Sequence, residues 1–196
     1  MILNEGEDLA SVIESQTSRG LLKSRIVVLS EGIGSTAAKR VIEQLLTMEQ
    51  DDPEKDIWIY LNSPGGEVSS GFGIYDTIRF IKPKVKIIVT GLAASIATVI
   101  LLAADRENRI SLPNSRLLIH QPLIGGNIQG RASDLEITAN EILKTREKLV
   151  QLYHQETKQP IARLQKDIER DYWMTPSEAL EYGLISRIVA HSSEIK

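Results

Sequence analysis

Four short segments place polar or glycine-rich groups at the ends of apolar stretches, where loops commonly carry catalytic side chains. Ser95 stands among small residues, His120 ends an apolar run, and Asp171 lies in an acidic run. A hydroxyl, an imidazole and a carboxylate are together the groups of serine-type hydrolysis, in which the imidazole takes the hydroxyl proton. Sequence order alone does not establish that these three side chains meet.

The glycine-rich segment is Asn-Ser-Pro-Gly-Gly at residues 62–66, directly after a predicted strand. Proline fixes one backbone dihedral angle and the two glycines allow a sharp turn, so main-chain N–H groups can point into a cleft. Amides placed in this way can stabilise an oxyanion. A tight turn without chemistry is the alternative, because glycine and proline mark turns in all proteins.

Ser95 lies in the segment Gly-Leu-Ala-Ala-Ser-Ile-Ala, residues 91–97, where a predicted strand ends and an apolar helix begins. Small neighbours can admit a substrate carbonyl to a nucleophile, and a helix start adds amides and a favourable dipole beside developing negative charge. The alternative is that Ser95 only caps a buried helix.

His120 ends the apolar segment 115–119 and is the side chain best suited to proton transfer near neutral pH. The two other histidines are predicted to lie on the surface, His154 within a long helix and His191 in the polar tail. A purely structural role remains the alternative for His120.

A carboxylate that orients a histidine must be held away from bulk water. Asp171 directly precedes Tyr172 and Trp173, which could bury it, and Asp167 and Glu169 are rival carboxylates in the same run. A solvated charged turn is the alternative. No metal site is predicted, because the histidines are scattered and the sequence has no His-Glu-x-x-His motif or aspartate-rich loop.

The composition is that of one globular domain spanning residues 1–196, with 42% hydrophobic and 25% charged residues. A net charge of -3 gives no basic footprint for nucleic acid, and the absence of cysteine excludes disulfides and a cysteine nucleophile. The amino terminus carries acids where a secretory signal carries basic residues, so we expect a cytoplasmic protein, with a plastid or mitochondrial homologue left open. The apolar stretch 85–104 contains turn signals and polar residues, which favours a buried strand and helix over a membrane span.

Short β-branched runs alternate with longer amphipathic stretches, which predicts an α/β fold with crossover helices. Strands are predicted over 25–30, 56–63, 84–91, 115–122 and 184–190. Helices are predicted over 35–50 with Ser35 as the cap, over 68–81, from about 133 to 157, and after Thr175 as far as Tyr182 and Gly183. The long helix is expected to carry one apolar stripe, formed by Leu135, Ala139, Ile142, Leu149 and Leu152.

Several long motifs, taken in order, resemble the proteolytic (ClpP) subunits of the caseinolytic Clp protease family. They are Asp52-Pro53-Glu54-Lys55, YLNSPGGEVSSGFGIYDTIRFIKPKV, GLAAS, LPNSRLLIHQP, ILKTREKL and ERDYWMTPSEALEYGLI. The resemblance implies a ClpP/crotonase-like α/β fold of repeated β-β-α and β-α-β units with a protruding strand-plus-helix handle. It implies a serine endopeptidase with Ser95, His120 and Asp171 as the catalytic triad, and with the backbone amides of Gly66 and Ile96 as the oxyanion hole.

The resemblance further implies two stacked heptameric rings, a tetradecamer enclosing a chamber, with a handle at about 122–157 and an amino-terminal axial segment at 1–20. An AAA+ unfoldase such as ClpX, ClpA or ClpC would dock on the ring and feed in unfolded polypeptides. ATP would be used by that partner, because this chain has no Walker-type phosphate loop, and no cofactor is expected here.

Three features depart from the family pattern and predict a second isoform. Ile96-Ala97-Thr98 replaces methionine, glycine and a small residue, the handle loop has an insertion around Ile124 and Ile128, and the stretch before Leu21 lacks the usual tyrosines. One alternative is therefore a subunit that is silent alone and acts in mixed rings with another ClpP isoform. A crotonase-type acyl-CoA enzyme is a remote alternative, because that class shares the fold without requiring the three side chains together.

Overall fold

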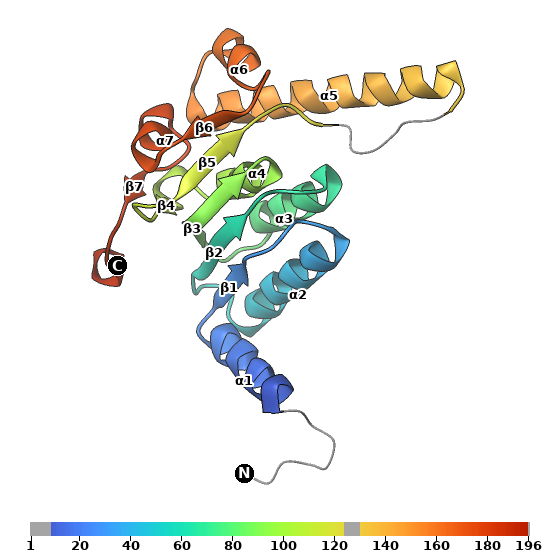
Figure 1. Cartoon of the computed structure of the whole chain (residues 1–196). Coiled ribbons are helices and arrows are strands. Elements are labelled where there is room, and N and C mark those ends of the chain that lie inside the picture. The colour runs from blue at the N-terminus through green and yellow to red at the C-terminus, as the bar shows by residue number, and fades with distance from the viewer. Residues whose placement is uncertain (1–8, 124–129, 196) are drawn as a thin grey trace.

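The computed structural model describes residues 9–123 and 130–195. Within them, helices alternate with strands, and seven strands form one sheet, as an α/β fold requires (Figure 1). The strands are β1 (Ile26–Leu29), β2 (Ile57–Ser63), β3 (Val85–Ala94), β4 (Arg109–Ser111), β5 (Arg116–Ile119), β6 (Tyr172–Met174) and β7 (Arg187–Ile188).

The strands follow the order β1-β2-β3-β4-β7, and β5 pairs with both β3 and β6. Each pair is parallel except β5 with β6, which is antiparallel. The long strand β3 has two successive neighbours, because residues 87–89 pair with β4 whereas residues 92–94 pair with β5. The carboxyl ends of β2, β3 and β5 therefore lie side by side at the same end of the sheet.

Helices α2 (Ser35–Asp51), α3 (Val68–Phe80) and α4 (Ile96–Leu102) pack on one face of the sheet (Figure 1). All seven residues of α4 are buried, as the sequence predicts for the apolar stretch after Ser95. Buried residues alternate with half-buried ones along β2, which is the pattern of a strand covered fully on one face only. The main core thus lies between the sheet and these three helices.

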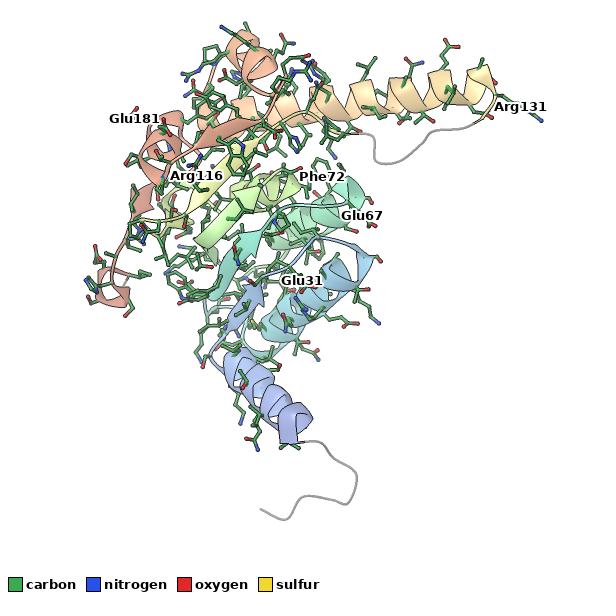
Figure 2. The ribbon with its side chains drawn as sticks, in the orientation of Figure 1. Glu31, Glu67, Phe72, Arg116, Arg131 and Glu181 are labelled. Atoms are coloured by element: carbon green, nitrogen blue, oxygen red, sulfur yellow. The ribbon has the colours of Figure 1, made fainter. Side chains whose placement is uncertain are left out.

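Helix α5 (Ala132–Thr157) packs against the core only near its carboxyl end, and the rest extends away from the molecule (Figure 1). Side chains along the extended part stand in open space as far as Arg131 (Figure 2). The predicted stripe is therefore buried at Leu149 and Leu152, whereas Leu135 is exposed, as are its neighbours Ile137 and Leu143. The handle strand expected before this helix falls within residues 122–130, of which 124–129 lie outside the described residues.

Four elements have no counterpart in the sequence prediction: α1 (Leu9–Lys23), β4, α6 (Ile161–Asp167) and β6. Strands β4 and β6 have three residues each and α6 has seven, so they are too short to show a periodic pattern. Helix α1 contains Gly20, and the run 14–20 has no apolar side chain, which interrupts its helical pattern. Two short 3-10 helices, Arg106–Asn108 and Ser192–Glu194, complete the described chain.

Several predicted boundaries differ from the structure. Strand β3 continues three residues past the predicted end at 91, and β5 ends three residues before the predicted end at 122. The strand predicted over 184–190 is only β7, because Leu184 and Ile185 are buried in the core before the strand begins. Gly34, not Ser35, occupies the cap position of α2, and no side chain caps that helix. Helix α7 (Pro176–Tyr182) begins with a capping box at Thr175 and ends at Gly183, as predicted.

Of the helices in the described part of the chain, none combines the length and the apolar character that crossing a bilayer requires.

Candidate active site

Ser95 stands at the junction between β3, which ends at Ala94, and α4, which begins at Ile96. Its backbone angles are φ 58° and ψ −128°, a conformation that costs a residue with a side chain about 1–3 kcal/mol. The surrounding main chain holds this turn, because the Ser95 N–H donates to the Leu118 carbonyl at 3.0 Å. Ser95 occupies the cap position of α4, but its hydroxyl makes no capping hydrogen bond, so a purely capping role is not what this geometry favours.

The glycine turn after β2 lies directly against Ser95. Gly65 has φ 91°, and a Cβ atom built there would lie 2.6 Å from the Ala94 carbonyl oxygen and 2.7 Å from Ser95 Cβ. Both distances are shorter than real contacts, so only glycine fits without a shift of the backbone. The close approach leaves the space beside the serine free of side chains from this turn.

Gly66 is held beside Ile33 by two main-chain hydrogen bonds. The Ile33 N–H donates to the Gly65 carbonyl at 2.8 Å, and the Glu67 N–H donates to the Ile33 carbonyl at 2.7 Å. Within the described part of the chain, neither the Gly66 N–H nor the Ile96 N–H donates a hydrogen bond to another group. The two amides expected to form the oxyanion hole therefore belong to touching backbone segments and are both available as donors.

Strand pairing brings His120 and Asp171 together. In the antiparallel pair of β5 and β6, Leu118 faces Trp173 and Ile119 faces Tyr172, so the next position in the register sets His120 opposite Asp171. The adjoining loop is closed by the Gln121 N–H, which donates to the Ile168 carbonyl at 2.7 Å. His120 Nδ1 lies 3.3 Å from Asp171 Oδ1.

This pair is close but not aligned for hydrogen bonding. The buried His120 Nδ1 has no hydrogen-bond partner within the described residues, despite the short distance to the carboxylate. The imidazole side chain is only 14% exposed, whereas the Asp171 side chain is 64% exposed. An aspartate in this environment can orient the ring, but water screens its charge.

The expectation that Tyr172 and Trp173 bury Asp171 is wrong. Tyr172 packs against the ring of Tyr182 with centroids 5.7 Å apart, and the Trp173 ring stacks on Arg116 and is 46% exposed. Alternation along the strand turns Tyr172 away from the side of Asp171. Trp173 shares that side but its ring lies against Arg116, and the carboxylate stays exposed.

His120 lies between two hollows of the surface. A narrow one is lined by Val68, Ser95, Ile96, Val99, His120, Gln121, Pro122, Leu149 and Tyr153. The second, of about 400 Å³, is lined by His120, Gln121, Leu123, Glu169, Arg170 and Asp171. Of the three predicted residues, His120 alone lines both hollows, sharing one with Ser95 and the other with Asp171, as a base between a serine and a carboxylate would.

Two residues beside Ser95, Thr98 and Tyr153, carry no functional prediction from the sequence, and of these Tyr153 lines the narrow hollow. Thr98 is fully buried within the apolar helix α4, and its hydroxyl contacts both the Ser95 carbonyl and the Tyr153 hydroxyl. The available signal was a polar residue inside an otherwise apolar helix. Tyr153 gave no comparable signal, because its partner is 55 positions away in the sequence.

Ile96, one of the departures from the family pattern, is accommodated by a glycine on the neighbouring helix. A Cβ atom at Gly71 of α3 would lie 2.1 Å from Ile96 Cγ1, so the absence of a side chain at position 71 makes room for isoleucine. The Ile96 side chain is 2% exposed. The larger residue is thus packed against α3 beside the nucleophile.

The rival residues are engaged elsewhere. Asp167 accepts a hydrogen bond from the Tyr182 hydroxyl at 2.8 Å, and Glu169 pairs with Arg146 at 3.4 Å. His154 is half-buried rather than on the surface, with Nδ1 2.7 Å from the Gln159 carbonyl oxygen, whereas His191 is exposed as predicted.

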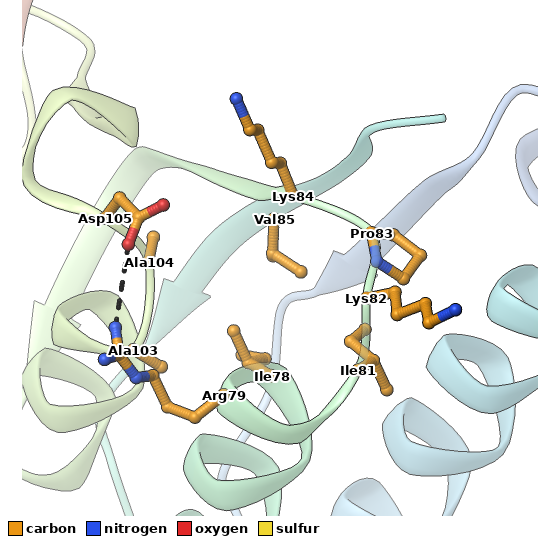
Figure 3. Close-up of a pocket in the computed structure, with 10 residues that line it drawn as sticks. All are labelled: Ile78, Arg79, Ile81, Lys82, Pro83, Lys84, Val85, Ala103, Ala104 and Asp105. Atoms are coloured by element: carbon orange, nitrogen blue, oxygen red, sulfur yellow. Dashed lines mark ion pairs between the residues drawn. The ribbon is translucent and has the colours of Figure 1, made fainter. Parts of the chain in front are cut away.

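A separate hollow of about 260 Å³ lies near the amino end of β3 (Figure 3). Its charged residues are Arg79, Lys82, Lys84 and Asp105, of which Arg79 and Asp105 form an ion pair at 3.7 Å. No serine or histidine is among the residues that line it, so it offers no alternative site for nucleophilic hydrolysis. Among the residues the structure describes, no group of three or more histidine, aspartate or glutamate side chains could hold a metal ion.

Comparison with known families gives one match that spans nearly the whole chain. A family model described as Clp protease matches residues 10–192. The matched region contains the serine turn, the glycine turn and the β5–β6 pair described above. The chain therefore belongs to the Clp protease family and is a peptidase of that type.

Proposed function

We propose that the chain is a serine endopeptidase subunit in which Ser95 is the nucleophile, His120 the general base and Asp171 the group that orients the imidazole. The backbone amides of Gly66 and Ile96 supply the oxyanion hole. The substrate is the peptide bond of an unfolded polypeptide, and this chain uses no cofactor.

The arrangement around His120 is the observation that carries the proposal. Its Nδ1 lies 3.3 Å from Asp171, and the ring also lines the hollow that contains Ser95. With Nδ1 beside a carboxylate, Nε2 is the nitrogen left to accept a proton from the serine. Family membership supports the same chemistry at the level of a peptidase.

In the first half of the reaction, Ser95 Oγ attacks the peptide carbonyl carbon while His120 takes the hydroxyl proton. Negative charge moves to the carbonyl oxygen, where the Gly66 and Ile96 N–H groups can donate hydrogen bonds to it. When the C–N bond breaks, His120 returns the proton to the leaving amine, and an acyl ester remains on Ser95. Asp171 stabilises the imidazolium during this step.

In the second half, a water molecule replaces the amine. His120 takes a proton from the water as its oxygen attacks the ester carbonyl, and the same amides stabilise the second oxyanion. Collapse of this intermediate breaks the bond to Ser95 Oγ and returns the proton to the serine. The products are a free carboxyl terminus and the starting enzyme.

Labelling with a fluorophosphonate tests the nucleophile. We expect a covalent adduct on Ser95, located by peptide mass spectrometry, and no adduct in Ser95→Ala. Ser70→Ala is the matched control, because Ser70 lies on α3 and its hydroxyl donates to the Glu67 carboxylate. Labelling that persists in Ser95→Ala would refute the assignment, and a wild-type chain that labels neither alone nor in mixed rings would favour a crotonase-type acyl-CoA enzyme.

A second candidate is a subunit that is silent alone and active in mixed rings with another isoform. The observation that favours it is the His120 ring, whose Nδ1 is near Asp171 but not aligned with it within the described chain. Misplacement of a catalytic group by about 1 Å can cost about a hundredfold in rate. A fluorogenic peptide assay on the purified chain, then on a mixture with a partner ring, separates the two, since activity only in the mixture supports this candidate.

We further propose that the chain assembles into stacked heptameric rings and receives substrate from an AAA+ unfoldase that uses ATP. The support is the family match together with the extended part of α5, where Ile137 and Leu143 are 63% and 60% exposed. Apolar side chains on an isolated helix favour burial against another subunit. Electron microscopy tests the ring, and degradation of a folded protein only with unfoldase and ATP tests the partner.

A further inference from the structure

The peptide unit between Ser95 and Ile96 carries two groups that face opposite ways. Its carbonyl belongs to Ser95, and its N–H is the Ile96 amide of the proposed oxyanion hole. The described chain has no cis peptide bond, so this unit is trans, and the direction of the carbonyl fixes the direction of the N–H. Any group that holds the Ser95 carbonyl therefore aims the Ile96 amide.

Thr98 donates two hydrogen bonds to the Ser95 carbonyl oxygen. Its main-chain N–H donates to the Ser95 oxygen at 3.0 Å, and its hydroxyl Oγ1 donates to the same oxygen at 2.6 Å. A threonine hydroxyl has one proton, and here that proton is used on the Ser95 carbonyl. The Thr98 oxygen is consequently an acceptor for its other neighbour, the Tyr153 hydroxyl, which lies 2.5 Å away.

The resulting chain of hydrogen bonds runs in one direction, from the Tyr153 O–H to the Thr98 O–H to the Ser95 carbonyl. Thr98 is fully buried and Tyr153 is 1% exposed, so water does not compete for these hydroxyl groups. Burial raises the pKa of Tyr153 to about 12, and the phenol therefore keeps its proton at neutral pH. Hydrogen bonds linked in this way polarise one another, which strengthens the hold on the carbonyl.

We propose that Thr98 and Tyr153 are positioning residues that aim the Ile96 N–H at the oxyanion, a role that rests on the proposed serine peptidase function. The strained angles of Ser95 make such a hold necessary, because a strained turn persists only when its surroundings determine it. Tyr153 lies on the buried end of α5, so the aim of the amide depends directly on how that helix packs against α4.

Four variants test this role in a fluorogenic peptide assay and by the rate of fluorophosphonate labelling. Loss of one oxyanion donor typically lowers kcat by a factor of about 100 or more, so we expect Thr98→Val to lower kcat about 100-fold. Tyr153→Phe leaves the Thr98 hydroxyl in place and should lower kcat about tenfold. KM should stay within about twofold, because the oxyanion forms only in the transition state. Thr98→Ser keeps the hydroxyl and should stay within about threefold of wild type, and the double variant should be no worse than Thr98→Val alone.

Two controls remove comparable hydroxyl groups elsewhere. Thr77→Val loses a threonine hydroxyl that bonds to the Gly73 carbonyl in α3, and Tyr182→Phe loses a phenol that bonds to Asp167. Both should retain the wild-type kcat within about twofold, because neither hydroxyl group touches the Ser95 turn. Thermal melting of every variant shows whether it is folded, and Tyr153→Phe, the mildest change, keeps the test decisive if Thr98→Val does not fold.

Each outcome decides the inference. Equal kcat in wild type, Thr98→Val and Tyr153→Phe would overturn it, as would a loss in Thr98→Ser as large as in Thr98→Val, or an effect on KM alone. The assays use whichever assembly, single or mixed rings, labels in the wild type. A wild type that labels in neither overturns the peptidase proposal itself, whereas a labelled wild type with an equally labelled Thr98→Val overturns only the positioning role.

Discussion

Replacement of Gly65 by alanine is the sharpest test of the contact between the glycine turn and the nucleophile. The added methyl group would lie 2.6 Å from the Ala94 carbonyl oxygen and 2.7 Å from Ser95 Cβ. Neither neighbour is the end of a flexible side chain, so neither can move aside without moving the backbone. The glycine turn must therefore retreat from Ser95, and the Gly66 amide must move with it.

The size of the retreat follows from the two distances. Ordinary contact begins at 3.4 Å, so the methyl group is about 0.8 Å too close to the carbonyl oxygen. Displacement of a catalytic group by nearly 1 Å costs on the order of 100-fold in rate, and we expect that loss in kcat. The positive φ of 91° adds a destabilisation of about 1–2 kcal/mol for alanine, which should lower the melting temperature.

Peptide hydrolysis and fluorophosphonate labelling measure the first effect, and thermal melting measures the second. Gly73→Ala is the matched control, because Gly73 lies within helix α3 and a Cβ atom there would meet Ile42 Cδ1 of α2 at 3.6 Å, an ordinary contact. Alanine is the better helix former, so this control should keep its activity and gain about 0.5–1 kcal/mol of stability. Gly65→Ala with activity within about threefold of wild type would refute the argument that the turn positions an oxyanion donor.

Three further predictions concern packing, a buried cation and a helix cap. Gly71→Ala should destabilise the chain, because its methyl group would meet Ile96 Cγ1 at 2.1 Å. Adding Ile96→Ala removes this clash, so in thermal melting the double variant should lose less stability than the two single variants combined. Additive losses of stability would contradict this contact. Arg25→Met should cost about 2–4 kcal/mol in a denaturant titration, since the guanidinium donates to four main-chain carbonyls between residues 48 and 56, and a loss below about 1 kcal/mol would show that water replaces these bonds. Hydrogen bonds from the Thr175 N–H and hydroxyl lower the pKa of Glu178 below its usual 4.5, so this carboxylate stabilises the fold above that pH and the contribution is lost as the pH falls through the lower, folded pKa. Between about pH 5 and 3, the melting temperature of Glu178→Gln should therefore fall less steeply than that of the wild type. Parallel curves would refute the linkage.

Local sequence carried the parts of the site that depend on local geometry. The glycine pair after β2 predicted a tight turn, and Gly65 and Gly66 have the positive φ angles that glycine adopts readily. The segment around Ser95 predicted the junction of a strand and an apolar helix, and β3 and α4 meet there. His120 was placed at the end of an apolar strand, where β5 in fact ends at Ile119. These inferences hold because the restrictions act within a few neighbouring residues.

The partner of the histidine could not be derived in the same way. Asp171 reaches His120 through β6, a strand of three residues that has no detectable period and that pairs with β5 across about fifty residues of sequence. Only the family resemblance favours Asp171 over Asp167 and Glu169, and these two rivals are bonded elsewhere. Contacts of this length depend on tertiary packing, which leaves little trace in the residues themselves.

The same sheet geometry explains why one member of the proposed triad is exposed. The glycine turn, Ser95 and His120 follow the carboxyl ends of β2, β3 and β5, which lie together because β3 pairs with β5 over its second half. Asp171 instead precedes the antiparallel strand β6, whose described partner is β5 alone, so it stands at the edge of the sheet with 64% of its side chain exposed. A carboxylate at an edge is desolvated only when another surface covers that edge. The exposure of Asp171 in a single chain is therefore a physical reason for activity to depend on assembly, and a ring contact that covers this edge would strengthen its hold on His120.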